Sequence, residues 1–411
     1  MTISFGAAVG VVCAGVWIHL FFFRGGFWRV WMFDDDRGQV PVPQQFPPVI
    51  AIVPARNEAA TIGLTVVALL KQEYPGSLRV VMVDDHSDDG TGRVAAKNAE
   101  EVAALAATEN RGIAEFAIYS AATLPSGWTG KLWALNEGVR CASQGEQKRE
   151  ESAEFYWFTD ADVEHAPDTL RRLVSRAKTD KLDLASLMVL LRARSFPEKI
   201  LIPAFLYFFL QLYPPKWIAD RASHTAGAAG GCLLIRREAL QRIGGLAAIR
   251  DAMIDDCALA RAVKNSGGRI WMGVTRASIS LRDYASFTEI RDMIARTAFT
   301  QLHYSALLLL LTMVGLGLTY LAPVALFFVG GTPARALGVL SYVTMASSFL
   351  PAVRYYRLSP AWVLLLPATA LFYAWATLLS AVRYWLGKGG QWKGRAQAPS
   401  SSSSSSSASS F

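Results

Sequence analysis

Charged residues and cysteines are both scarce in this chain of 411 residues. Asp, Glu, Lys and Arg make up 18% of it, below the roughly one quarter that is usual in soluble domains. Together with 52% hydrophobic residues, this excludes a disordered or collagen-like chain and argues against a purely soluble protein. The four cysteines are widely spread without C-x-x-C spacing, which excludes a disulfide scaffold, disfavours a zinc site and favours a reducing compartment. They are Cys13, Cys141, Cys232 and Cys257.

Formal charge is missing altogether from four long apolar stretches. Residues 5–23 form the first, and they are long enough to cross a hydrocarbon core of about 30 Å. No basic start and no A-x-A-like site accompany them, so residues 1–30 are interpreted as a membrane anchor and not as a cleaved signal peptide. Because Arg24 and Arg29 follow, the positive-inside tendency places the next part of the chain in the cytoplasm. The other stretches are residues 305–331, 336–353 and 361–382.

These last three stretches predict a C-terminal transmembrane region over residues 304–385. The middle one is the shortest and contains Pro351, so it either crosses or forms a re-entrant or interfacial segment. We expect three crossings. Residues 386–411 are first basic and then almost pure serine from Ser400 to Ser410, a composition that predicts a disordered tail.

The net charge is positive, with 41 Lys and Arg against 33 Asp and Glu, or +8. Such a balance is compatible with nucleic-acid binding. Many of the basic residues stand beside the apolar stretches, however, where anionic lipid headgroups explain them more simply. We therefore expect a membrane and no nucleic acid as partner. These basic residues are Arg24, Arg29, Arg354, Arg357, Arg383, Lys388, Lys393 and Arg395.

Residues 48–303 form the soluble middle of the chain, which has the length of one large domain. An apolar run of strand type at residues 49–53 is followed by helical spacing over residues 61–72 and by a second apolar run at 79–83. This order predicts an α/β domain with a mainly parallel, Rossmann-like sheet. Further strands are predicted over residues 116–119, 156–159, 184–191, 231–235 and 269–274.

Acidic residues cluster where the predicted strands end, which is where ligands bind on parallel sheets. Asp84 and Asp85 follow the second strand, and Asp160 and Asp162 follow another. Two carboxylates at i and i+2 can bind a hard divalent cation that also holds phosphate oxygens. Helix capping is the alternative, but it does not explain the adjacent Asp84 and Asp85, whose charges repel unless a ligand or cation relieves them.

Three further stretches have two interpretations each. Asp255 and Asp256 begin a helical pattern, either for chemistry or for favourable charge at a helix N-terminus. The glycine-rich residues 225–231 indicate a backbone that is closely approached by another segment or by an acceptor. Residues 200–213 are apolar but too short to span a bilayer comfortably, which predicts an interfacial helix or a buried core helix.

The order of these acidic clusters resembles the family 2 glycosyltransferases with the GT-A fold, over residues 49–301. The flanking apolar stretches, with Arg383-Tyr384-Trp385 and residues 390–395, resemble most closely the hopanoid-biosynthesis-associated glycosyltransferases of bacterial inner membranes. The resemblance implies a multi-pass enzyme of hexosyltransferase type whose catalytic domain faces the cytoplasm. It implies inverting transfer of a sugar from a nucleotide donor, UDP-linked by expectation, to a lipid acceptor such as a hopanoid, with Mg²⁺ or Mn²⁺ as cofactor.

The resemblance also implies roles for individual residues. Asp256 would be the catalytic base, with Asp255 orienting the acceptor or tuning its neighbour through like-charge repulsion. Asp160 and Asp162 would face the metal and the diphosphate. Lys131 lies in a stretch that resembles the family's G-K-x-x-A-L-N-x-G motif and would neutralise diphosphate charge. The nucleoside pocket would be lined by Pro54, Arg56, Glu58, Asp84 and Asp85.

The chain departs from one pattern of this family. Processive polysaccharide synthases carry Q-x-x-R-W where residues 293–297 read Met-Ile-Ala-Arg-Thr. Only Arg296 matches, which implies contact with the diphosphate but argues against a growing polymer. A polysaccharide synthase, a nucleotidyl transferase of the same fold, and a non-enzymatic membrane scaffold or transport component are the alternatives. The last is disfavoured because the apolar stretches lack the ionisable residues that transport pathways use.

Overall fold

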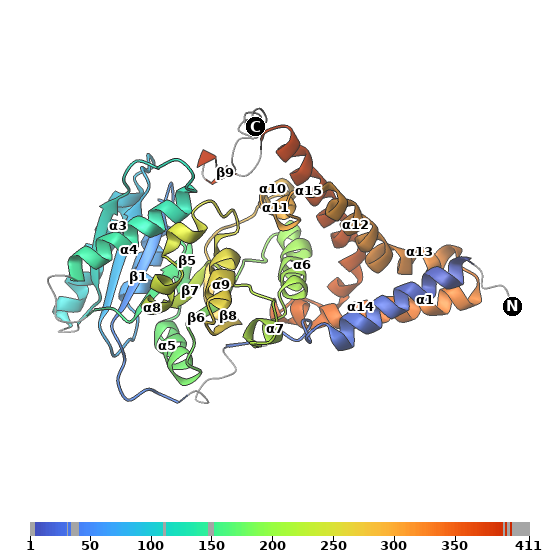
Figure 1. Cartoon of the computed structure of the whole chain (residues 1–411), viewed down its shortest axis with the longest axis horizontal. Helices are drawn as coiled ribbons and strands as arrows, with labels where there is room; N and C mark the ends of the chain where they lie inside the picture. The colour runs from blue at the N-terminus through green and yellow to red at the C-terminus, as the bar shows by residue number, and fades with distance from the viewer. Residues whose placement is uncertain are drawn as a thin grey trace, which may run out of the picture.

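The chain folds into a domain built around a sheet, with long apolar helices beside it (Figure 1). The computed structural model describes residues 5–30, 32–33, 41–109, 112–146, 152–388, 391–392 and 395–396. The serine run from Ser400 to Ser410, predicted to be disordered, lies outside the described residues.

An eight-stranded sheet forms the centre of the domain, in the order β3-β2-β1-β4-β7-β6-β8-β5. Strand β1 is parallel to β2 and β4, β2 to β3, and β6 to β8. Strand β7 is antiparallel to both of its neighbours and β5 to β8. The predicted α/β class with a mainly parallel sheet is confirmed. The strands are β1 (Val49–Ala55), β2 (Leu78–Asp84), β3 (Glu115–Ser120), β4 (Phe155–Thr159), β5 (Val163–His165), β6 (Leu184–Leu190), β7 (Cys232–Arg236) and β8 (Ile270–Ser280).

Helices cover both faces of the sheet, and the alternation along β1 shows how. Val49 and Ala51 belong to the apolar core shared with α2, α3 and α5, whereas Ile50 and Ile52 belong to the core shared with α4 and α9. Because successive side chains point to opposite faces, a strand buried on both sides is apolar throughout. The helices of the domain are α2 (Ile62–Leu70), α3 (Thr91–Thr108), α4 (Gly130–Glu146), α5 (Thr169–Thr179), α7 (Pro215–Ala219), α8 (Arg237–Arg242), α9 (Asp255–Asn265), α10 (Phe287–Ala295) and α11 (Ala298–Gln301).

Two strands differ from the sequence-based expectation. Strand β8 continues to Ser280 and does not end at Val274, and the short strand β5 was not predicted. The two differences have one cause, because the far end of β8 pairs with β5, with Glu164 opposite Ile279. A polar run such as residues 275–280 gives no strand signal until a distant segment pairs with it.

Four helical segments among the described residues are long and apolar enough to cross a membrane, which indicates membrane association. The stretch expected at residues 336–353 belongs to a longer helix that includes Pro351, so its length is ample for a crossing and the short re-entrant alternative loses its basis. The segments are Phe5–Phe23 (α1, Phe5–Ile18, and a π-helical turn), Ala306–Val329 (α12, Ala306–Leu316, a π-helical turn and α13, Ala322–Val329), Thr332–Tyr355 (α14) and Pro360–Trp385 (a 3₁₀ turn and α15, Leu366–Trp385).

Helix α6 (Phe196–Leu212) joins the sheet domain to these apolar helices (Figure 1). The hydroxyls of Tyr207 and Ser348 of α14 lie 2.7 Å apart, and Tyr373 of α15 donates a hydrogen bond to the carbonyl of Leu201. Its middle is buried, and Phe196 and Leu212 at its two ends are exposed. Residues 200–213 are therefore mostly a buried helix, and only the helix ends have an interfacial character.

Candidate active site

A cavity of about 550 Å³ lies at the carboxyl ends of β1 and β4. It brings together residues from separate parts of the sequence, and a narrower hollow beside it adds Gly230 and Asp256. Most of the predicted site residues thus share one wall. The residues that line the cavity are Pro54, Glu58, Lys131, Asp160, Ala161, Asp162, Met253, Asp255, Arg282, Asp283, Tyr284, Glu289, Asp292, Met293 and Arg296.

Lys131 links two of the predicted acidic clusters. Its Nζ lies 2.9 Å from Asp160 Oδ1 and 3.3 Å from Asp255 Oδ2. Burial alone would lower the pKa of the Lys131 ammonium, but Asp160 and Asp255 outweigh burial and raise that pKa above its ordinary value. Lys131 is therefore a permanent positive charge between the candidate metal ligand and the candidate catalytic pair.

Asp162 lies among like charges. Burial, and then the carboxylates of Asp160 and Glu58, raise the pKa of Asp162 to about 6. Glu58 comes from the loop after β1, so the crowding arises from the fold and not from the sequence spacing alone. A positive ligand placed here would relieve this repulsion.

Asp256 is held by backbone donors at the start of α9. The N–H of Gly230 donates to Asp256 Oδ2 at 2.8 Å, and that of Cys257 donates to Oδ1 at 2.7 Å. Burial and the neighbouring Asp255 raise the pKa of Asp256 to about 6. A carboxylate has about four acceptor positions, so this fixed side chain still has capacity to receive a proton.

The glycine-rich residues 225–231 pack against protein and so resolve one open alternative. A Cβ on Gly227 would lie 2.8 Å from the Tyr213 ring, and one on Gly230 would lie 3.2 Å from Lys131 Nζ and 3.3 Å from Asp256 Oδ2. It is thus another segment that closely approaches this backbone. Gly230 in particular leaves room for the lysine and the acid to meet.

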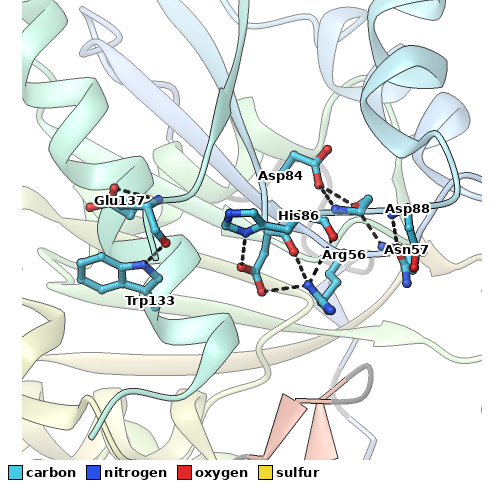
Figure 2. A network of polar contacts seen from close by, with 10 residues as sticks. Arg56, Asn57, Asp84, His86, Asp88, Trp133 and Glu137 are labelled. Atoms are coloured by element: carbon cyan, nitrogen blue, oxygen red, sulfur yellow. Dashed lines mark hydrogen bonds and ion pairs between the residues drawn. The ribbon is translucent and has the colours of Figure 1, made fainter. Parts of the chain in front are cut away.

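Arg56, Asp84 and Asp85 lie outside the cavity wall, at the adjacent ends of β1 and β2 (Figure 2). The backbone N–H and hydroxyl of Ser87 donate to Asp84 Oδ1 at 3.0 and 2.6 Å. The Arg56 guanidinium donates to the carbonyl of Asp85 and lies 3.8 Å from its buried carboxylate. Of the predicted nucleoside residues, only Pro54 and Glu58 reach the cavity, and the other three form a polar network beside it.

The next strand end is fixed by α4, as Figure 2 also shows. Trp133 Nε1 donates to the carbonyl of Ala122 at 2.8 Å, and the N–H of Ala122 donates to buried Glu137 at 3.4 Å. Neither side chain was predicted to have a role. Both hold the chain after β3 in place next to the Arg56 network.

The donor set fits a divalent cation that is shared with a substrate. Seven of the cavity residues are Asp or Glu, and three are Lys or Arg. Within the described part of the chain no three His, Cys, Asp or Glu residues converge on one metal position, so the protein would supply Asp160 and Asp162 at most. Mg²⁺ is commonly bound by one or two carboxylates together with substrate phosphates.

Sequence reasoning missed the cavity wall formed by Arg282, Asp283 and Tyr284. These residues follow β8, so the rule that ligands bind beyond strand ends applies to them. The strand was expected to end at Val274, six residues before its observed end at Ser280. Arg296, by contrast, was predicted and lines the cavity from the end of α10.

Comparison with known proteins agrees with this architecture. Residues 50–244 match the family described as Glycosyl transferase family 2. This range includes three of the acidic clusters and ends before Asp255. No curated protein is significantly similar to the chain.

Solved structures share the fold. A mannosyltransferase from Pyrobaculum calidifontis, in complex with GDP-Man and Mn²⁺, has a TM-score of 0.53 and 19% identity over 91% of this chain and 99% of its own. Mannosyl-3-phosphoglycerate synthase from Rubrobacter xylanophilus has a TM-score of 0.36 and 17% identity over 67% of this chain and 83% of its own. The domain that holds the acidic clusters is therefore a family 2 glycosyltransferase domain of GT-A type, and the chain is a glycosyltransferase.

Proposed function

We propose that this protein transfers a sugar from a nucleotide-sugar donor to a lipid acceptor, with inversion at the anomeric carbon. The observation that carries the proposal is the single cavity in which Lys131, Asp160, Asp162 and Asp255 meet, next to Asp256. A cationic side chain, a pair of carboxylates suited to a metal, and a held acid are the parts that glycosyl transfer requires.

The donor diphosphate lies against Lys131, Asp160 and Asp162 in this proposal. Because acidic residues outnumber basic ones in the cavity, an anionic diphosphate needs an added cation to bind. Asp160 and Asp162 would hold Mg²⁺ or Mn²⁺, which when bound neutralises the charge of the diphosphate leaving group. The structurally similar mannosyltransferase was solved with GDP-Man and Mn²⁺, which supports a cation of this class.

The nucleoside lies toward the neighbouring strand ends. Pro54 and Glu58 extend the cavity in that direction, and Arg56, Asp84 and Asp85 form the polar network beyond them. Carboxylate oxygens there can accept hydrogen bonds from the base or the ribose. We propose a UDP-linked sugar as the first donor to test.

Asp256 acts as the general base. The acceptor hydroxyl gives its proton to the Asp256 carboxylate while its oxygen bonds to the anomeric carbon. The bond from that carbon to the diphosphate breaks, and its electron pair leaves with the nucleoside diphosphate. A pKa of about 6 suits a base that must be ionised near neutral pH. Lys131 holds Asp255 beside it, so that Asp255 can orient the acceptor.

The membrane-type helices support a lipid as the acceptor. Helix α10, which carries Arg296 and other cavity residues near its end, packs on α15, where Arg383 pairs with Asp292 at 2.8 Å. The cavity therefore adjoins the apolar region. We propose a hopanoid as the acceptor, because of the resemblance of residues 383–385 and 390–395, and the cytoplasmic face of a bacterial inner membrane as the location.

The test uses purified protein in detergent with a panel of nucleotide sugars, Mn²⁺ or Mg²⁺, and hopanoid, undecaprenyl phosphate, diacylglycerol or total lipid extract. Release of nucleoside diphosphate and labelled lipid are measured for the wild type and for Asp256→Asn. We expect release that depends on metal and lipid and is lost in the variant. Absence of both release and nucleotide binding with every donor would overturn the proposal.

A further inference from the structure

Glu198, in the first turn of α6, is a buried acid that the proposed chemistry does not use. Its side chain is 2% exposed, yet three backbone N–H groups donate to it. Those of Arg194 and Ser195 donate to Oε2 at 2.8 Å each, and that of Tyr284 donates to Oε1 at 2.8 Å. An ionised carboxylate is a pure acceptor, so its two oxygens satisfy all of these donors.

The bond to Tyr284 goes beyond helix capping. A capping box needs only the exchange between Ser195 and Glu198 within the first turn. Here Ser195 also donates its hydroxyl to the carbonyl of Tyr284 at 3.1 Å, so both backbone groups of Tyr284 are bound to α6. Arg192 pairs with Asp283 at 2.5 Å and adds a third link to the same segment.

The segment that is held in this way forms part of the cavity wall. Arg282 and Tyr284 line the cavity, and the Arg282 guanidinium lies over the Tyr284 ring at 5.5 Å. The N–H of Leu281, just before them, donates to the carbonyl of Asp162 at 2.7 Å. Arg282 is therefore held on the side of the candidate metal ligands, where it can contact an anionic group.

We propose that Glu198 is a positioning residue that fixes residues 282–284, and that it acts through Arg282 on the diphosphate of the donor. This inference rests on the proposed function. A glutamine at position 198 would keep the volume, but it would turn an NH₂ group toward a backbone N–H, so one link must open. The segment would then move away from the donor, while Asp256 and its backbone donors stay in place.

The experiment is a double-mutant cycle on the full chain in detergent, with Glu198→Gln, Arg282→Met and the combined variant. We expect Glu198→Gln to raise the KM for the donor by about tenfold, as expected for the loss of one charge-assisted contact, with little change in kcat. Arg282→Met should raise it at least as much. The combined variant should equal Arg282→Met alone, because residues that act through one contact are not additive.

Matched controls separate positioning from stability. Ser195→Ala removes the hydroxyl bound to Tyr284, whereas Ser305→Ala removes an N-cap hydroxyl from α12 that is remote from the cavity. Only the first should raise the donor KM. If Glu198→Gln is not recovered as folded protein, the same cycle with Ser195→Ala decides.

Additive effects on KM, or an unchanged donor KM in both α6 variants, would overturn the inference while leaving the transferase intact. Failure of the proposed function has a different signature, because the wild type would then release no nucleoside diphosphate with any donor. Competition by free nucleoside diphosphate provides a second readout. Its inhibition constant should rise in Glu198→Gln as the donor KM does.

Discussion

Two acidic edges of one sheet are built in different ways. At the end of β2, Asp84 is bound by the hydroxyl and N–H of Ser87, three residues on. At the end of β4, Asp160 depends on Lys131 from α4, and Asp162 has acidic neighbours that raise its pKa to about 6. The first edge is satisfied by its own turn, whereas the second edge has an excess of negative charge. Hydrogen-bonded acids of the first kind suit binding, and crowded acids of the second kind suit a cation and chemistry.

The largest effect is expected at the crowded edge, from Asp256→Asn. The amide cannot accept the acceptor's proton, so kcat should fall by about 10²- to 10⁴-fold, the usual contribution of a general base. Nucleoside diphosphate release at saturating donor measures this. Asp251→Asn, an exposed acid shortly before α9, serves as the control. Loss of less than threefold would move the role of base away from Asp256.

Removal of divalent cations should come next. Because seven acids face three basic residues in the cavity, chelation should reduce turnover by about 10²-fold or more, since a bound metal supplies several kcal/mol of charge stabilisation. It should also weaken donor binding. Asp162→Asn should raise the Mn²⁺ concentration needed for half-maximal rate. Full activity in excess chelator would show that Lys131 and the arginines suffice, and the contrast between the two edges would lose its meaning.

The sequence could reveal these two edges because each follows a strand that is apolar on both faces. In β1, residues 49–53 are buried on both sides, and the acids come where the apolar run stops. That rule needs only local pattern. It predicted the shared cavity of Asp160, Asp162 and Lys131 through strand ends and resemblance, without any distance.

The rest depended on contacts that are distant in sequence. Arg282 and Tyr284 were missed because β8 ends at Ser280 only when it pairs with β5. Glu198 looks like an ordinary first-turn acid until Tyr284, 86 positions away, is seen to donate to it. A local pattern cannot show which backbone donors a buried carboxylate will meet, since tertiary structure brings them together.

A third prediction uses the pH dependence of the crowded edge. Burial and Asp255 raise the pKa of Asp256 to about 6, so the base is ionised above this value and protonated below it. We expect kcat to be level at higher pH and to fall about tenfold per pH unit below about pH 6. A profile of kcat from pH 4.5 to 8 with saturating Mn²⁺ and donor measures it. A break near 4 would indicate a base without such crowding.

Gly230→Ala should have a smaller effect. Its Cβ would lie 3.2 Å from Lys131 Nζ and 3.3 Å from Asp256 Oδ2, so both side chains must shift by a few tenths of an ångström. We expect kcat to fall by roughly tenfold, because catalytic groups tolerate little misplacement. Gly112→Ala, where a Cβ meets nothing within 4 Å, should leave the rate unchanged. Equal rates in both variants would show that the contact has slack.

The smallest effect is expected at the satisfied edge, from Asp84→Asn. The amide oxygen can still accept from Ser87, so the turn should persist, and only a hydrogen bond from the nucleoside to the second oxygen is lost. One such bond contributes about 0.5 to 1.5 kcal/mol, so the donor KM should rise by roughly three- to tenfold with kcat unchanged. Initial rates across donor concentrations separate the two constants. A fall in kcat instead would place Asp84 in the chemistry and remove the distinction between a binding edge and a reacting edge.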